Sequence, residues 1–278
     1  MKNMNIGFID YYLDEWHANN YPKMLSEISG GRMKVNLAYA MIDSPIGGRT
    51  TDEWCRDMGM RRALSIEEVV NNSDALIVLS PDNCEMHEQL CRIPLMSGKP
   101  TYIDKTFAPD GEAAKRIFAV AQEHSTPCYS TSALRYASEY KGIKEVDSIS
   151  SWGPNGLETY SIHQLEPIVM LMGKDAKRVM YIPGNDYYKV IIDYGCGRTA
   201  SMNGFIKGSP FMMNITSKEG SKLINVESDY FGGFIKNLAA FFDDPQNIVP
   251  HEETIAIMTI RACAIKAQQT PMEWVNIK

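Results

Sequence analysis

The first half of the chain alternates short apolar runs with amphipathic helical segments, and this alternation constrains the fold more than any other feature. Runs with the length and apolar content of buried strands occupy residues 5–10, 34–43, 75–80, 100–104 and 127–132. Segments with helical patterning lie between them, at residues 21–29, 65–73, 81–98 and 112–125. A repeated strand–helix order predicts a doubly wound parallel sheet, and such sheets bind ligands beyond the carboxyl ends of their strands.

The second half of the chain has a different pattern, in which strands follow one another without intervening helices. Strands are expected at residues 178–183, 186–195, 197–207, 211–218 and 222–228, and helices at 163–173, 232–244 and 251–269. Successive strands joined by short turns form an antiparallel sheet. We therefore expect an α/β fold with a Rossmann-like doubly wound sheet over residues 1–130. An α+β domain with an open antiparallel sheet is expected over residues 131–278.

Composition excludes several classes of function. The formal net charge of the 278-residue chain is −6 and no Lys/Arg-rich run occurs, which argues against nucleic acid or an anionic membrane as a partner. No apolar run reaches the roughly 18–20 residues that a membrane span needs. The six cysteines form no C-x-x-C pair and the five histidines lack metal-ligand spacing, so we expect reduced thiols and no metal. No signal-peptide pattern precedes the first strand, and a cytoplasmic location is expected.

The most specific segment is residues 97–136, in which a strand ends at Asp104 and Lys105, a helix follows, and a further strand leads to Arg135 and Tyr136. This segment resembles the Gfo/Idh/MocA family of NAD(P)-dependent sugar and polyol oxidoreductases, which has a GKPVFVEKPLA-like motif here. Residues 76–90 (LIVLSPDNCEMHEQL) and 156–173 (GLETYSIHQLEPIVMLMG) are similar to two further segments of that family. The resemblance covers nearly the whole chain.

The resemblance implies roles for three candidate catalytic residues. Lys105 corresponds to the active-site lysine, whose ammonium would hydrogen-bond a substrate hydroxyl and assist hydride transfer. His163 corresponds to the general acid–base histidine and is expected to head a helix. Glu166 lies one helical turn further on, where it would orient the His163 ring or bind a sugar hydroxyl, or else remain a solvated carboxylate.

Other positions are expected to contact a cofactor, which the resemblance implies is NAD(P), and the acidic Asp43 favours NAD over NADP. These candidates lie at the ends of the predicted strands: Asp10, Tyr11, Tyr12, Asp43, Ser80, Pro81, Asp104, Lys105 and Arg135. An acidic residue such as Asp43 usually accepts the ribose hydroxyls, although a turn aspartate is an equal alternative. Packing of Arg135 across the domain junction is an equal alternative. Asp82 is expected to cap a helix, and His87 to be a structural histidine.

The sequence departs from the family at the phosphate-binding turn. The three positions of the glycine fingerprint G-x-G-x-x-G fall at Asp10, Tyr12 and Glu15, and carboxylates there repel phosphate. Proline is tolerated in the first turn of a helix but disfavoured in its interior. Because of Pro22, the helix is expected to start near Asn19 or Asn20.

The catalytic segments depart from the family pattern as well. Asp104 stands where the family has Glu, Thr106 where it has Pro, and Ser161 where it has Gly. Thr159 replaces the Asp that usually pairs with the histidine, which leaves Glu158 or Tyr160 as the partner of His163.

Two functions remain open on the sequence. The first is an NAD(P)-dependent oxidoreductase acting on a sugar, polyol or related hydroxy compound. The second is a non-redox sugar-binding protein, lyase, isomerase or partner subunit that has lost dinucleotide binding. The resemblance also implies a homodimer or homotetramer formed through the antiparallel sheet, whose candidate interface residues are Tyr187, Tyr188, Phe205, Phe211, Met212 and Met213.

Overall fold

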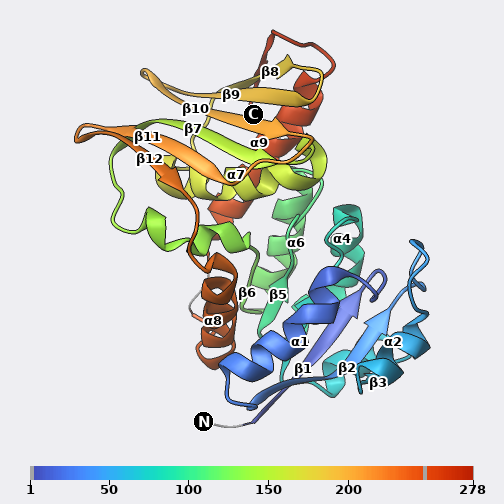
Figure 1. Ribbon diagram of the computed structural model, residues 1–278. Coiled ribbons are helices and arrows are strands. Elements are labelled where there is room, and N and C mark those ends of the chain that lie inside the picture. The colour runs from blue at the N-terminus through green and yellow to red at the C-terminus, as the bar shows by residue number, and fades with distance from the viewer. Residues whose placement is uncertain (1–2, 247–248, 278) are drawn as a thin grey trace. The chain divides into compact units, whose positions relative to one another are not determined.

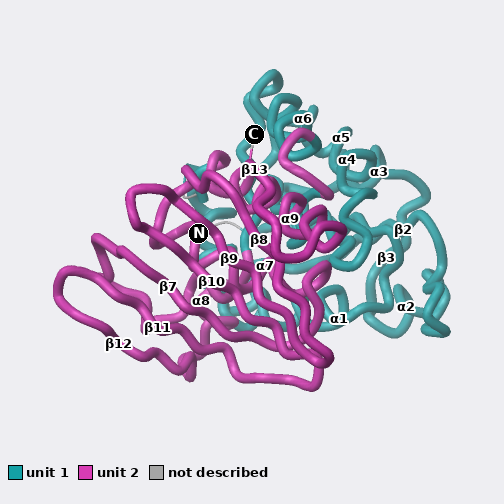
Figure 2. Tube along the Cα trace, turned by 90° about the horizontal axis from the view of Figure 1, so that it is seen from above, with its two compact units in different colours: residues 1–108, 113–131, 235–250 teal, residues 109–112, 132–234, 251–278 magenta. Residues whose placement is uncertain are grey.

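The computed structural model describes residues 3–246 and 249–277 (Figure 1). The chain forms two compact units (Figure 2). The first unit comprises Met1–Ala108, Ala113–Thr131 and Ile235–Pro250, and the second comprises Pro109–Glu112, Ser132–Phe234 and His251–Lys278. The chain thus leaves the first unit near residue 131 and returns to it over residues 235–250, which the predicted division at 130 and 131 assigns to the second domain.

The first unit is built on a parallel sheet. Its strands are β1 (Met4–Asp10), β2 (Met33–Ala40), β3 (Arg61–Arg62), β4 (Ala75–Val78), β5 (Thr101–Ile103) and β6 (Cys128–Tyr129). The six strands are arranged in the order β3-β2-β1-β4-β5-β6, and every neighbouring pair is parallel. Ile6, Phe8 and Ile9 of β1 and all four residues of β4 are fully buried, as parallel strands covered on both faces require. The predicted doubly wound sheet is confirmed.

Six helices accompany this sheet in the described part of the chain. They are α1 (Trp16–Ile28), α2 (Thr51–Asp57), α3 (Ile66–Asn71), α4 (His87–Leu90), α5 (Arg92–Leu95) and α6 (Gly111–Glu123). The predicted cap of α3 is present, because the Ser65 side chain accepts a hydrogen bond from the Glu68 backbone N–H at 3.2 Å. The predicted cap at Asp82 is wrong. The chain instead enters a 3₁₀ turn at Cys84–Met86 through Asn83, which makes no side-chain capping bond.

The start of α1 differs from the prediction. The helix begins at Trp16 rather than near Asn19 or Asn20, and Pro22 lies inside it. The reason is the Glu15 side chain, which accepts hydrogen bonds from the first backbone N–H groups of the helix and so stabilises an earlier start. Glutamate is not among the preferred N-cap residues, which explains why the sequence pattern pointed elsewhere.

The second unit contains a seven-stranded sheet. Its strands are β7 (Val146–Pro154), β8 (Arg178–Pro183), β9 (Tyr187–Gly195), β10 (Arg198–Phe205), β11 (Met212–Ser217), β12 (Gly220–Asn225) and β13 (Trp274–Asn276). The order is β12-β11-β7-β10-β9-β8-β13, and all neighbours are antiparallel except β7 and β10. The expected second sheet is therefore present, and it is mixed rather than antiparallel throughout, because β7, which was not predicted, pairs in parallel with β10.

Helices cover one face of this sheet. α7 (Leu157–Met172) and α9 (His251–Ala267) run beside the strands (Figure 1). Gln164 of α7 joins the helix to the sheet, because its side chain accepts a hydrogen bond from Ser151 at 2.8 Å and donates one to the Asn203 carbonyl at 3.1 Å. α7 begins before the predicted segment, so His163 lies inside the helix rather than at its head.

The candidate interface residues do not share one face of the sheet. Tyr188 and Met213 are buried, whereas Tyr187 is half exposed and Met212 is partly exposed. Successive residues of a strand point to opposite faces, so Tyr187 and Met212 lie on the face away from the helices. Phe205, which pairs with Tyr187 in the sheet, lies on that face as well.

The returning segment completes the first unit. α8 (Tyr230–Asp243) enters this unit at Ile235. Its Asp243 carboxylate pairs with the Arg32 guanidinium through two hydrogen bonds of 2.7 and 2.6 Å. The Tyr129 ring of β6 packs edge-on against Phe241, with centroids 4.8 Å apart. A segment distant in sequence therefore supplies part of the packing around the parallel sheet.

We expect Gly7→Ala to destabilise the first unit, because Gly7 lets the α3 region approach β1 closely. A Cβ atom at this position would lie 2.3 Å from Val69 Cγ1 and 2.4 Å from Ser73 Oγ. Overpacking of this kind lowers the free energy of unfolding by about 1–3 kcal/mol. Urea unfolding measures the change. Gly156→Ala, where no atom lies within 4 Å of the added Cβ, is the control and is expected to change stability much less. Equal stability of both variants would contradict the packing argument.

Candidate functional site

Glu15 occupies the N-terminus of α1, directly after β1 in the first unit. Its carboxylate accepts hydrogen bonds from the backbone N–H groups of His17, at 2.7 Å, and of Ala18. The His17 ring nitrogen Nδ1 lies 2.6 Å from the same carboxylate. Glu15 is only 8% exposed, so the protein itself fills the anion-binding end of this helix.

Asp10, the last residue of β1, is a fully buried carboxyl group beside this cap. Its Oδ1 atom accepts a hydrogen bond from the Tyr11 backbone N–H at 2.7 Å, and its Oδ2 atom has no hydrogen-bond partner among the described residues. Burial, and then repulsion from the neighbouring carboxylates of Glu15 and Asp104, raises the pKa of Asp10 well above its usual range. Asp10 therefore retains its proton at pH values where an exposed aspartate has lost it.

Asp104 follows β5 and is also fully buried. The hydroxyl groups of Tyr21 and Tyr102 donate hydrogen bonds to its Oδ1 atom, at 3.2 and 3.1 Å. Burial, followed by the charge of Asp104, raises the pKa of both tyrosines far above their usual range, so both remain donors. Two buried hydroxyls thus fix the orientation of this carboxylate.

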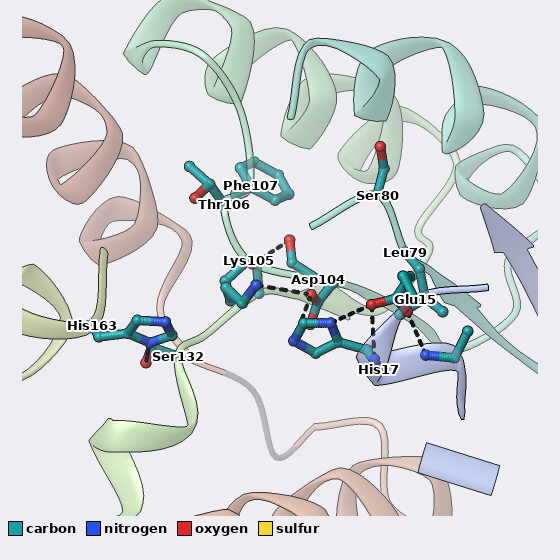
Figure 3. A network of polar contacts seen from close by, with 12 residues as sticks. Glu15, His17, Leu79, Ser80, Asp104, Lys105, Thr106, Phe107, Ser132 and His163 are labelled. Atoms are coloured by element: carbon teal, nitrogen blue, oxygen red, sulfur yellow. Dashed lines mark hydrogen bonds and ion pairs between the residues drawn. The ribbon is translucent and has the colours of Figure 1, made fainter. Parts of the chain in front are cut away.

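The other oxygen of Asp104 lies between the nitrogen atoms of two side chains, His17 and Lys105. Its Oδ2 atom lies 3.8 Å from His17 Nε2 and 3.8 Å from Lys105 Nζ. Glu15, His17, Asp104 and Lys105 therefore form a chain in which carboxylates alternate with nitrogen bases (Figure 3). We call these four residues the charge chain. The Lys105 and His17 side chains are 14% and 13% exposed, so the charge chain reaches the surface at these two residues.

The remaining cofactor candidates of the first unit have local roles in the structure. Asp43 is exposed, and its carboxylate accepts a hydrogen bond from the Thr51 backbone N–H at 2.7 Å, which lowers its pKa. Ser80 is buried with a φ of 111°, and its hydroxyl donates to the Asn83 carbonyl at 2.9 Å. Pro81 follows it directly. The Tyr11 and Tyr12 rings meet edge to face, with centroids 6.1 Å apart.

His87 is the structural histidine that the sequence predicts. It is fully buried, and its ring nitrogens lie 2.8–3.1 Å from the backbone carbonyls of Leu79, Thr106 and Phe107. Burial lowers the pKa of this imidazole. The residue holds the ends of β4 and β5 together beside the charge chain. The peptide bond between Lys105 and Thr106 is cis.

In the second unit, His163 has a hydrogen-bond partner that the sequence analysis missed. Its Nδ1 atom lies 2.8 Å from the hydroxyl of Ser132, so the partner of this nitrogen is Ser132 and not Glu158. The Tyr160 and Phe211 rings pack edge-on around the imidazole, with centroid distances of 5.1 and 5.8 Å. Ser132 is fully buried and its hydroxyl also accepts the Leu134 backbone N–H, so it orients the ring and is not an exposed nucleophile.

Glu166 and Arg135 form an ion pair within the second unit. Glu166 is buried, accepts the Ser132 backbone N–H at 3.1 Å, and pairs with Arg135 Nε at 2.6 Å. The Arg135 guanidinium also contacts Glu253. Burial opposes the charge of Arg135, but the two carboxylates outweigh it and raise its pKa. Glu166 is thus linked to His163 through Ser132, and Arg135 is engaged inside its own unit.

The sequence analysis missed the hydrogen bonds that Glu15, His17 and Ser132 make. The histidine two residues after Glu15 was a usable signal, because a carboxylate at a helix start and a nearby imidazole often pair.

No group of three or more metal-ligating side chains could hold an ion within residues 3–246 and 249–277. None of the helices in the described residues is long and apolar enough to cross a membrane.

Solved structures share this architecture over the full chain. A probable dehydrogenase from Thermotoga maritima superposes with a TM-score of 0.80 at 12% identity, covering 98% of each chain. The scyllo-inositol dehydrogenase of Lactobacillus casei, solved with NAD(H) and scyllo-inositol, gives a TM-score of 0.80 at 15% identity, covering 99% of each chain. A putative myo-inositol dehydrogenase from Sinorhizobium meliloti gives 0.75 at 12% identity, covering 99% of each chain.

The sequence resemblance to Gfo/Idh/MocA oxidoreductases is therefore confirmed at the level of the fold: a Rossmann-like unit and a second unit built on a large mixed sheet. No protein-family model matches the sequence, and no curated protein matches it. At identities of 10–16%, these structural matches establish a shared fold and no more. The chemistry of this chain has to be argued from its own residues.

The residues at the α1 N-terminus do not fit the diphosphate of a dinucleotide as they stand. Rossmann folds hold this group on the first N–H groups of the helix, behind a glycine-rich turn. Here Glu15 already accepts those N–H groups, and the buried carboxyl groups of Asp10 and Asp104 lie beside it. A diphosphate at this place would meet negative charge in a poorly solvated environment.

We expect Asp10→Asn to stabilise the protein more at pH 8 than at pH 5. The folded-state pKa of Asp10 is raised, so the folded protein holds a proton that the unfolded chain releases. The stability of the wild type therefore falls as the pH rises from the unfolded pKa, about 3.9, towards the folded pKa. Asparagine carries no charge and keeps an oxygen for the Tyr11 N–H.

Urea midpoints at the two pH values measure this effect. Asp147→Asn, at an exposed position of β7, is the matched control and is expected to follow the wild type. If Asp10→Asn shows the same difference between the two pH values as the wild type, Asp10 titrates normally and the buried-carboxyl interpretation is wrong.

Proposed function

We propose that the chain is an NAD-dependent oxidoreductase acting on a sugar, polyol or related hydroxy compound. The observation that carries the proposal is the full-length similarity to a scyllo-inositol dehydrogenase solved with NAD(H) and its polyol, combined with Lys105 at the end of β5. The carboxyl end of a parallel strand is where doubly wound sheets act on ligands. In this proposal the first unit binds the cofactor and the second contributes to substrate binding and assembly.

Lys105 binds and polarises the reacting hydroxyl. Asp104 lies 3.8 Å from its Nζ atom, and two tyrosine hydroxyls hold Asp104 in place, so the ammonium has a fixed position. A fixed ammonium stabilises negative charge that develops on a substrate oxygen. Its partial exposure leaves room for the hydroxyl of a ligand.

His163 is proposed as the acid–base group of the second unit. Ser132 lies against its Nδ1 atom and so orients the ring, and the imidazole is proposed to exchange the proton. Glu166 acts through Ser132 as a positioning residue. The predicted cofactor contacts remain Asp10, Tyr11, Tyr12, Asp43, Ser80, Pro81, Asp104, Lys105 and Arg135. Asp43 already accepts the Thr51 N–H, and Arg135 already pairs with Glu166 and Glu253, so each would have to bind a cofactor beside these partners.

We expect Lys105→Ala to lower kcat/KM by about 10²–10⁴-fold on a polyol found by screening, because a positioned proton donor or acceptor contributes that much. The measurement follows nicotinamide reduction across a panel of inositols, sugars and hydroxy acids. Lys23→Ala is the control, since the Lys23 side chain is 79% exposed on α1. Full turnover by Lys105→Ala would refute the assignment of Lys105.

A second candidate function is favoured by one specific observation. Glu15 fills the place where a dinucleotide diphosphate would bind, so a cofactor-free lyase or isomerase that keeps Lys105 is consistent with the site. Conversion of a sugar without any change in nicotinamide absorbance would favour this candidate. Strict dependence of turnover on added NAD would exclude it.

We also propose a homodimer or homotetramer formed through the open face of the second sheet. Tyr187 and Ile206 on or beside this sheet are each 50% exposed, which suits burial against a partner.

We also propose a cytoplasmic location, which the six free cysteines support.

We expect sedimentation at micromolar concentration to give a dimer or tetramer, and Tyr187→Asp to shift it towards monomer, because a buried unpaired carboxylate opposes association. Glu219→Gln, at the exposed turn between β11 and β12, is the control. A monomer for the wild type would contradict the assembly.

A further inference from the structure

The backbone N–H groups that could bind an anion at the N-terminus of α1 are already hydrogen-bonded to the Glu15 side chain. α1 spans thirteen residues, and its first free backbone N–H groups, from His17 and Ala18, point to the Glu15 carboxylate. A carboxylate and a phosphate oxygen accept the same kind of hydrogen bond and carry the same sign of charge. Glu15 therefore stands in the position of a bound phosphate.

We propose that Glu15 competes with the diphosphate of a dinucleotide for the N-terminus of α1. A dinucleotide gains these hydrogen bonds only when the Glu15 carboxylate leaves them. The identity of the competing ligand rests on the proposed function, whereas the occupation of the helix end is a property of this chain.

His17 retains Glu15 in place. Its Nδ1 atom lies 2.6 Å from the Glu15 carboxylate, while its Nε2 atom faces Asp104 at 3.8 Å. The imidazole thus lies between Glu15 and Asp104, and movement of Glu15 breaks contacts to two backbone N–H groups and one ring nitrogen. The cap is part of an organised network rather than a solvated side chain.

The neighbouring carboxyl groups act in the same direction. The Oδ2 atoms of Asp10 and Asp104 are buried and make no hydrogen bond within the described residues, and both groups interact electrostatically around the end of β1. An entering diphosphate would therefore meet the buried carboxyl groups of Asp10 and Asp104 in addition to Glu15. Removing the Glu15 side chain frees the N–H groups of His17 and Ala18 and removes one of these carboxyl groups.

Calorimetric titration of the full chain tests the proposal, with NAD⁺, NADH and inorganic pyrophosphate as probes. The variants are Glu15→Gln, which keeps an oxygen acceptor without the charge, and Glu15→Gly, which removes the side chain and leaves a residue accepted at an N-cap. Glu27→Gln, whose side chain is 66% exposed near the other end of α1, is the matched control. Circular dichroism melting checks that each variant is folded.

We expect Glu15→Gly to bind pyrophosphate and NAD at least tenfold more tightly than the wild type. Glu15→Gln should show a smaller gain, and it carries the test if Glu15→Gly does not fold. Glu27→Gln should match the wild type. Equal or weaker binding of both probes by the Glu15 variants would overturn the proposal.

The two probes separate this proposal from the proposed function. Tight NAD binding by the wild type and by both Glu15 variants alike would overturn the competition and leave the oxidoreductase proposal intact. Tighter pyrophosphate binding by the Glu15 variants, with no NAD bound by any protein, would support the competition and remove NAD from the proposed function. No binding of either probe to any protein would overturn both.

Discussion

The hydrogen bonds between the first turn of α1 and the Glu15 carboxylate are the interaction on which the first unit depends. They set the start of the helix, keep a negative charge at the end of the parallel sheet, and bring His17 against Asp104. Asp104 in turn lies 3.8 Å from the Nζ atom of Lys105, the proposed catalytic lysine. One capping interaction thus connects the local folding of a helix with the electrostatics of the candidate site.

The strands could be predicted well from the sequence, because buried parallel strands and alternating strands leave strong apolar patterns. β7 was missed since the serines of SISSW resemble a loop, although every second residue is buried in the sheet. The start of α1 was missed because Pro22 argues against a helix and glutamate is a weak capping signal. These failures come from tertiary contacts overriding local preference.

Lys105 and His163 could be proposed from motif order, but the groups that position them could not. Asp104 is adjacent to Lys105 in sequence, yet Tyr21 is distant from it, and only the sheet brings that hydroxyl to the carboxylate. Ser132 meets His163 because a 3₁₀ turn lies beside α7. Hydrogen bonds between distant segments leave no periodic trace in a sequence, whereas strand and helix faces do.

The return of residues 235–250 to the first unit has a consequence for biosynthesis. The Asp243 carboxylate that pairs with Arg32, and the Phe241 ring that packs on Tyr129, leave the ribosome only after most of the second unit has been made. The strands of the parallel sheet are therefore synthesised before residues 235–250, which pack on them. Until those residues are made, the strands expose apolar surface. A fragment ending near residue 131 would lack this part of its packing.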